Sequence, residues 1–205
     1  MIDSEQIIHY YDSHIKELWG ITAGGTLRSK KGTLGETLCE IIVKRAWKDI
    51  GGSLSRIYVG RQLYKISDKR GNVYRIGQDK QVYIDGEFIL SIECKAYTEV
   101  AMYKRIIVDS LLLKSKFPEL KFCIFQLESM LGGDYETNPS HPIGSPSVNV
   151  LNDFFPGIKI EILTMLDGGR EIKREIHKEE FYKPLAEARV QYALDYFKKI
   201  LSQVI

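Results

Sequence analysis

The spacing of apolar residues changes along the chain from a helical repeat to an alternating one and then back. Ile7, Tyr11, Ile15 and Leu18 recur every three or four residues, which is typical of one face of an amphipathic helix. Between residues 56 and 95 apolar and polar residues alternate instead, and this pattern predicts strands. The predicted helices are 4–18, 33–49, 99–116 and 178–204. The predicted strands are 56–66, 73–76, the two arms of a hairpin at 79–95, 121–127 and 158–166.

Short polar segments separate these elements and predict where they begin and end. Residues 22–32 are rich in glycine and basic residues and are predicted to form a loop. Thr33 and Glu36 have the spacing of a capping box, and Thr98 is predicted to cap the third helix. Residues 129–157 hold many Gly, Pro, Ser and Asn and are predicted to be a long irregular segment. The order of the elements predicts an α/β fold with a mixed sheet and helices on both faces.

The hairpin at 79–95 ends in a pair of charged residues. Side chains alternate along a strand, so Glu93 and Lys95 project from one face while Cys94 points to the other. These charges follow an apolar run in what is expected to be a central strand, where charged groups are costly unless they are used. The simplest alternative is a solvated Glu-x-Lys pair, which is common on strands.

The loop of this hairpin decides whether Asp79 lies on the same face as Glu93. A two-residue loop at Asp85–Gly86 would put Asp79 on the wrong face. A three-residue loop that includes Ile84 would place Asp79 opposite Ser91 and diagonal to Glu93, at roughly 7–8 Å. We predict the three-residue loop, with Asp85 as a turn residue.

Two carboxylates on one face of neighbouring strands suit a Mg²⁺ ion, which prefers a few carboxylate oxygens together with waters. Asp79 and Glu93 are the predicted ligands, and Lys95 is predicted to orient or help deprotonate the attacking water. Glu36 could reach the metal through a water. Glu40, one helical turn later, is a weaker candidate.

Composition narrows the class of protein. The chain has 205 residues, of which 44% are hydrophobic and 27% charged, and this is the balance of one ordinary globular domain, 1–205. No apolar run of about 18 residues occurs, so no membrane span is expected. The polar N-terminus is unlike a secretory signal, and the spacing of nucleotide-binding phosphate loops is absent, so no nucleotide cofactor is expected. Three cysteines without paired spacing favour a reduced, cytoplasmic protein. The net charge of +2 neither requires nor excludes nucleic acid.

The pattern Asp79…Glu93-Cys94-Lys95 resembles that of the PD-(D/E)xK nuclease superfamily, and within it the type II restriction endonucleases. The preceding helix carries Lys31-Gly32-x-x-x-Glu36, similar to the start of many such nucleases. The following helix and strand complete the family's αβββαβ core over about residues 33–128. The proline that normally precedes the aspartate is absent, because Gln78 stands there.

This resemblance implies a restriction-endonuclease-like mixed sheet and Mg²⁺-dependent hydrolysis of double-stranded DNA. It implies that Asp79 and Glu93 bind the metal, that the backbone carbonyl of Cys94 is a further ligand, that Lys95 is the catalytic lysine and that Glu36 is an accessory acid.

The additions to that core are 1–32, 129–205 and, inserted within it, 56–76, and they are expected to read DNA and to form a dimer. Polar and basic side chains supply base and phosphate contacts, although for any single basic residue a solvated surface charge is the simpler interpretation. The leading DNA-binding candidates are Arg28, Lys30, Lys31, Gln126, Ser129, Tyr135, Asn138, Arg170 and Lys173. Further candidates are Arg61, Lys69, Arg70, Glu128, Arg174, His177 and Lys178.

Three functions are compatible with these observations. The first is a site-specific restriction enzyme that acts as a homodimer, because two-fold DNA sites suit two-fold proteins. The second is a repair or recombination nuclease of the same superfamily that recognises DNA structure. The third is a non-catalytic binding module in which Glu93 and Lys95 form a structural ion pair.

Overall fold

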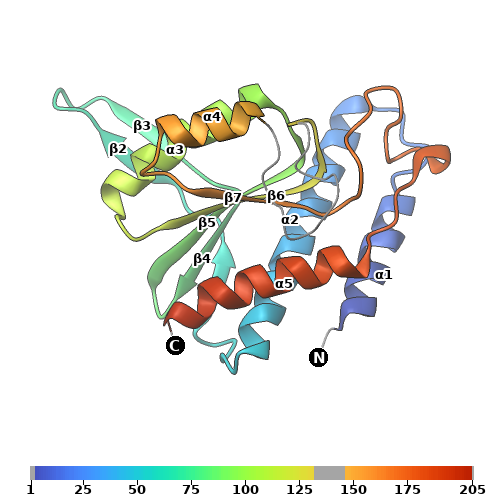
Figure 1. Ribbon diagram of the computed structural model, residues 1–205, viewed down its shortest axis with the longest axis horizontal. Coiled ribbons are helices and arrows are strands. Elements are labelled where there is room, and N and C mark those ends of the chain that lie inside the picture. The colour runs from blue at the N-terminus through green and yellow to red at the C-terminus, as the bar shows by residue number, and fades with distance from the viewer. Residues whose placement is uncertain (1–2, 132–145, 205) are drawn as a thin grey trace.

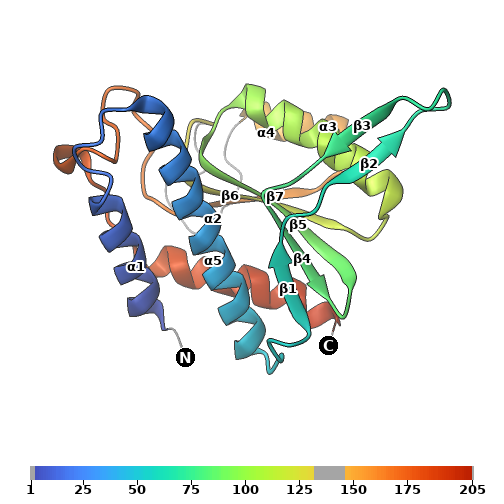
Figure 2. The ribbon, with the colours of Figure 1, turned by 180° about the vertical axis from the view of Figure 1, so that it is seen from behind.

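A five-stranded mixed sheet between two layers of helices forms the body of the molecule in the computed structural model (Figures 1 and 2), which describes residues 3–131 and 146–204. The strand order is β1-β4-β5-β6-β7, with antiparallel pairing from β1 to β5 and parallel pairing from β5 to β7. The strands of this sheet are β1 Ile57–Gly60, β4 Lys80–Ile84, β5 Glu87–Thr98, β6 Lys121–Ser129 and β7 Ile160–Thr164. The predicted α/β fold with a mixed, helix-flanked sheet is confirmed.

The helices cover the two faces of the sheet unequally. On one face, α2 (Gly24–Asp49) and α5 (Glu187–Leu201) pack together and against the strands, with α1 (Ser4–Lys16) outside them. On the other face lie α3 (Val100–Lys116) and α4 (Pro146–Phe154). Each face therefore has its own hydrophobic core. None of the helices in the described part of the chain is long and apolar enough to cross a membrane.

Helix α2 begins much earlier than its sequence pattern predicts. The predicted loop at 22–32 is wrong, because the helix already starts at Gly24, after Ala23 as the N-cap. Leu27 is buried in the same stripe as Leu34, and this tertiary burial outweighs the low helix propensity of the glycines. The capping box at Thr33 and Glu36 is wrong for the same reason: Thr33 lies inside the helix, where its hydroxyl donates to the carbonyl of Ser29.

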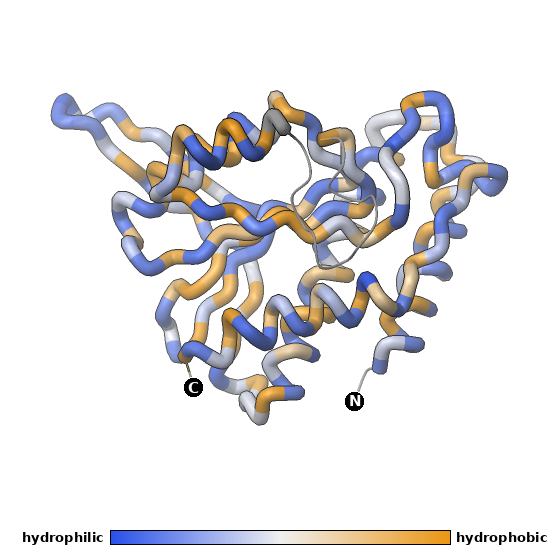
Figure 3. The backbone as a smooth tube through the Cα atoms, viewed as in Figure 1, coloured by the Kyte–Doolittle hydropathy of each residue, from blue (hydrophilic) through white to orange (hydrophobic). Residues whose placement is uncertain are grey.

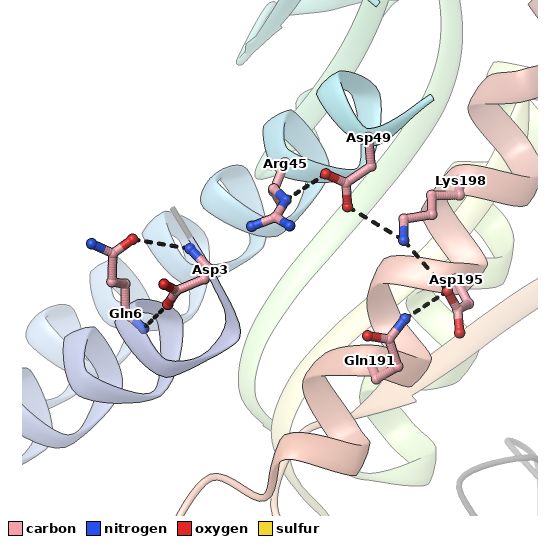
Figure 4. A network of polar contacts seen from close by, with 7 residues as sticks. All are labelled: Asp3, Gln6, Arg45, Asp49, Gln191, Asp195 and Lys198. Atoms are coloured by element: carbon pink, nitrogen blue, oxygen red, sulfur yellow. Dashed lines mark hydrogen bonds and ion pairs between the residues drawn. The ribbon is translucent and has the colours of Figure 1, made fainter. Parts of the chain in front are cut away.

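Helix α5 is joined to α2 by a chain of charged contacts shown in Figure 4. Asp49 accepts a hydrogen bond from Arg45 Nε at 2.5 Å and lies 3.3 Å from Lys198 Nζ on α5. Lys198 also approaches Asp195 at 3.7 Å. At the start of α1, the side chains of Asp3 and Gln6 form a capping box.

The predicted strand 56–66 is two strands that belong to different sheets. β1 pairs with β4, whereas β2 (Tyr64–Ser67) pairs with β3 (Val73–Ile76) in a separate two-stranded sheet. The side chain of Gln81 holds the chain at this break, since it accepts from the backbone N–H of Gln62 and donates to the carbonyl of the same residue. The β2–β3 hairpin projects from the body (Figures 1 and 2), and its tip is hydrophilic (Figure 3).

The remaining element boundaries differ in smaller ways. The predicted cap at Thr98 is wrong, because β5 continues through Thr98 and α3 follows Glu99. Within the segment predicted to be irregular, β6 continues to Ser129 and α4 forms a helix. The predicted last helix is shorter, with the 3-10 turns η1 (Glu179–Phe181) before it and η2 (Ser202–Val204) after it.

Gly32 offers a test of the extended helix α2. A Cβ built there meets nothing within 4 Å, so Gly32→Ala should raise the free energy of unfolding by about 0.5–1 kcal/mol. The matched control is Gly86→Ala, where a Cβ also meets open space but φ is +85°, and stability should fall by about 1–2 kcal/mol. Urea unfolding measures both changes, and a loss of stability in Gly32→Ala would contradict the helix.

Candidate active site

The turn of the β4–β5 hairpin differs from the predicted one. Asp85 and Gly86 both have positive φ, 50° and 85°, which is the geometry of a two-residue type I′ turn. Ile84 is accordingly paired with Glu87. The predicted three-residue loop is wrong.

A β-bulge restores the register that the two-residue turn would have lost. Tyr83 pairs with Phe88 but Val82 pairs with Leu90, so Ile89 is the extra residue on β5. Beyond the bulge, Lys80 pairs with Ile92. Asp79, the next residue out, therefore stands on the face of Glu93 and opposite it, a closer position than the predicted diagonal one.

The three predicted catalytic groups converge at this point. Lys95 Nζ lies 2.8 Å from Asp79 Oδ2 and 2.6 Å from Glu93 Oε1. Asp79 Oδ2 also accepts a hydrogen bond of 3.0 Å from the backbone N–H of Cys94. One ammonium thus holds two carboxylates that come from neighbouring strands.

Burial makes the charges in this cluster interdependent. The side chain of Glu93 is only 12% exposed, and this burial raises the pKa of its carboxyl group against the opposing effect of Lys95, with Asp79 adding to the rise. Burial alone would lower the pKa of Lys95, but Glu93 and Asp79 outweigh it and raise that pKa above the usual lysine value. Lys95 is therefore protonated at neutral pH and acts as a hydrogen-bond donor.

Glu36 reaches the same place from helix α2. It lines a groove of about 870 Å³ together with Asp79 and Lys95. Burial raises the pKa of Glu36, and the charge of Asp79 raises it further. This position agrees with an accessory acid beside the cluster.

The alternative acids are engaged elsewhere. Glu40 accepts from Lys44 at 2.6 Å and from Lys80 at 2.8 Å, which together lower its pKa despite its burial. Asp85 forms an exposed ion pair with Arg56 in the turn. Neither carboxylate lines the groove around Asp79.

The donor set is compatible with a hard divalent cation. Among the described residues, no group of three or more His, Cys, Asp or Glu side chains could hold a metal ion. Mg²⁺ needs no such group, because one or two carboxylates and waters suffice. Glu93 Oε2 is buried and has no hydrogen-bond partner within the described part of the chain. This carboxylate oxygen is therefore free to act as a metal ligand. Cys94 lines the groove as well, while its thiol is buried.

The predicted DNA contacts of the N-terminal segment differ in how exposed they are. Arg28 and Lys30 are exposed near the start of α2, and Arg28 lines the groove. Lys31 was expected on an exposed loop, but it is only 7% exposed on the buried side of α2. The expectation of an exposed Lys31 is therefore wrong, because this part of the chain is helical.

The predicted contacts within β6 and just after it, together with Lys173, fall into three groups. Gln126 and Ser129 are buried, and Gln126 pairs in register with Lys95 and donates to Thr164 Oγ1 at 2.8 Å. These two side chains are therefore covered in this structure, and the expected open position is not observed. Lys173 is exposed. Tyr135 and Asn138 lie outside the described residues.

Arg170 lines the groove and contacts Tyr97. Tyr97 was not identified from the sequence. The Arg170 guanidinium lies 3.7 Å from the centre of the Tyr97 ring, a cation–π contact. Tyr97 follows Lys95 at the spacing of two that puts residues on one face of β5, so the alternating pattern contained the signal. Arg170 and Tyr97 line the groove together with Lys95.

Comparisons with known proteins give one close relative. No protein-family model matches the chain. The type II restriction enzyme DdeI of Desulfomicrobium norvegicum is 38% identical over 202 residues, covering 88% of this chain and 84% of DdeI. A solved structure of BbvCI, described as a native A2B2 tetramer, is 10% identical and covers 98% of this chain and 87% of that chain, with a TM-score of 0.42. That score is below the level that indicates a common fold.

The raised pKa of Lys95 predicts the direction in which the stability of the protein changes with pH. The ion pairs of Lys95 contribute stability fully below the ordinary lysine pKa of about 10.4 and lose it as the pH rises through the higher folded-state value. Lys95→Met, which leaves two buried carboxylates without a cation, should be less stable than the wild type by about 3 kcal/mol near neutral pH.

Chemical unfolding over a pH series, with a metal chelator present, checks this expectation. The difference between wild type and Lys95→Met should shrink above about pH 10.4 as Lys95 loses its proton. The exposed Lys48, changed to Met in the same way, is the control and should show no comparable difference. A constant difference across the alkaline range would contradict the ion-pair account.

Proposed function

Because the chain belongs to the family of type II restriction enzymes, we propose that it is a Mg²⁺-dependent, site-specific endonuclease of the PD-(D/E)xK superfamily. Its substrate is double-stranded DNA, and the reaction is hydrolysis of a phosphodiester bond. The observation that carries this proposal is the convergence of Asp79 and Glu93 on Lys95, beside a groove that Asp79 and Lys95 line.

Asp79 and Glu93 would hold the Mg²⁺ ion, with the carbonyl of Cys94 as a further ligand. The buried and unpartnered Oε2 of Glu93 supports this role, since an uncompensated carboxylate oxygen is costly without a cation. When bound, the ion would lower the pKa of a coordinated water and neutralise negative charge on the phosphate.

Lys95 would orient the attacking water and donate to the phosphate as negative charge develops on its oxygens. Its raised pKa favours a donor over a base, because the ammonium does not readily give up its proton at neutral pH. Glu36, whose pKa is raised by burial, would act as an accessory acid that holds a water from the helix side of the groove.

The projecting β2–β3 hairpin would contact DNA. Residues 61–76 hold five basic residues and one acidic residue, a net charge of +4, whereas the whole chain is only +2. Lys65 and Arg75 lie directly opposite one another in the ribbon, a like-charge pair that costs stability. The single carboxylate, Asp68, is used by the turn, where it accepts from the backbone N–H groups of Arg70 and Asn72. A two-stranded ribbon of this kind fits the major groove.

A homodimer would place two such sites on a two-fold DNA sequence, so that each subunit cuts one strand. Val108 of α3 and Val150 and Phe154 of α4 are exposed large apolar side chains on one side of the sheet. They are candidates for the surface that the second subunit covers.

Cleavage of plasmid DNA tests the proposed reaction. With Mg²⁺ the wild type should produce discrete fragments, and Lys95→Ala should lower the rate by roughly 10²–10⁴-fold because a positioned donor is lost. Lys121→Ala, an exposed lysine at the start of β6, is the control and should cut like the wild type. Failure of the wild type to cleave any DNA, or full activity of Lys95→Ala, would contradict the proposal.

The charge of the hairpin predicts a salt-dependent loss of DNA affinity. If Lys69 and Arg70 each contact a phosphate, the double change to Ser should reduce the slope of log K against log salt by nearly two. Lys121→Ser with Lys159→Ser removes the same charge from exposed positions on the central sheet and should leave the slope unchanged. Equal slopes for the two double variants would show that the hairpin does not contact DNA phosphates.

A further inference from the structure

A lysine stands in the apolar stripe by which α2 packs against the rest of the molecule. Leu27, Lys31, Leu34 and Leu38 follow one another at helical spacing, and all four are buried. Within residues 3–131 and 146–204, no side chain forms a hydrogen bond or ion pair with the ammonium of Lys31. The ammonium itself is not among the fully buried polar atoms, and Lys31 lines the groove beside Lys95. A largely desolvated cation without a partner among the described residues suits an anion that enters this groove.

The carboxylates nearest to Lys31 are engaged with other cations. Glu128 Oε1 lies 2.9 Å from Lys183 Nζ. Glu175 is 3.8 Å from the guanidinium of Arg170 and 3.5 Å from Nε2 of His177. Burial lowers the pKa of Lys31, and the attraction of Glu175 and Glu128 does not offset it.

His177 provides a second unsatisfied nitrogen in the same place. The residue is 6% exposed, and its buried Nδ1 has no hydrogen-bond partner among the described residues. Burial lowers the pKa of His177, and the charge of Lys31 lowers it further, so the imidazole is neutral until an anion arrives. When protonated, its positive charge would add to the attraction for an anion bound at Lys31, while Nε2 faces Glu175.

Both residues belong to the groove beside the proposed catalytic cluster. Lys31 and His177 line it together with Asp79 and Lys95. Arg28 and Lys178 line it as well, and both are exposed. An anion bound by Lys31 would therefore be part of the same ligand that reaches Lys95.

We propose that Lys31, assisted by His177, binds a backbone phosphate of the DNA next to the one that is cut, and so positions the strand against Lys95. This assignment rests on the proposed function. It makes Lys31 a positioning residue that is buried before the substrate binds, unlike the exposed cations of the β2–β3 hairpin.

Binding of duplex DNA over a series of salt concentrations tests the assignment. The probe is a duplex DNA of mixed sequence, with Ca²⁺ in place of Mg²⁺ so that binding is measured without turnover. Lys31→Met should reduce the slope of log K against log salt by about 0.9, the contribution of one phosphate contact, and weaken binding at low salt about tenfold. Lys48→Met is the control, since Lys48 is exposed near the other end of the same helix and should leave both quantities unchanged.

Thermal unfolding without DNA separates positioning from a structural role. Lys31→Met keeps the volume of the side chain and removes an unpaired buried charge, so it should melt at the same temperature as the wild type or higher. A lower melting temperature together with weaker binding would mean that Lys31 supports the fold, and would overturn the assignment.

The binding data also distinguish this inference from the proposed function. A wild type that binds no duplex at any salt concentration would overturn both. A wild type that binds, with an unchanged slope in Lys31→Met, would overturn only the phosphate site and leave the endonuclease proposal standing.

Discussion

The register between β4 and β5 is the constraint on which the rest of the site depends. A type I′ turn at Asp85–Gly86 alone would send Asp79 to the face opposite Glu93. The extra residue at Ile89 shifts the pairing by one, and Asp79 arrives opposite Glu93 with Lys95 between them. Because side chains alternate with a period of two, such a shift moves every residue of the strand to the other face. The bulge therefore allows a two-residue turn while keeping Asp79, Glu93 and Lys95 on one face.

Some charged groups around the groove lack a full set of partners among the described residues. Lys95 compensates two carboxylates, yet one oxygen of Glu93 remains without a partner among the described residues. A buried ion pair is weak evidence for stability, because desolvation cancels much of its attraction. Lys31 presents the opposite imbalance, a largely buried lysine with no ion-pair partner among the described residues. Among the described residues the chain thus keeps one incompletely paired charge of each sign near the groove: Glu93 contacts Lys95, which lines the groove, and Lys31 lines it directly.

Helix α2 connects this chemistry to the fold. It packs on α5 and β5, so the hydrophobic core on that face determines where Glu36 and Lys31 stand. Its first half, as far as Glu36, contributes to the groove, and its last turn meets Lys198 of α5 through Asp49. The proposed catalytic cluster lies where β4 begins beside β5, and this helix packs over it from one side.

The residues of the candidate cluster could be predicted from the sequence, because charged groups in an apolar strand are conspicuous and alternation places Glu93 and Lys95 on one face. The mixed, helix-flanked sheet followed from the order of helical and alternating patterns. The start of α2 could not be predicted, since the burial of Leu27 and Lys31 against distant segments outweighs two glycines. The bulge at Ile89 and the burial of Gln126 also depend on neighbouring strands. Local propensity acts over a few residues, whereas register, burial and the pairing of charges are decided only when distant parts of the chain meet.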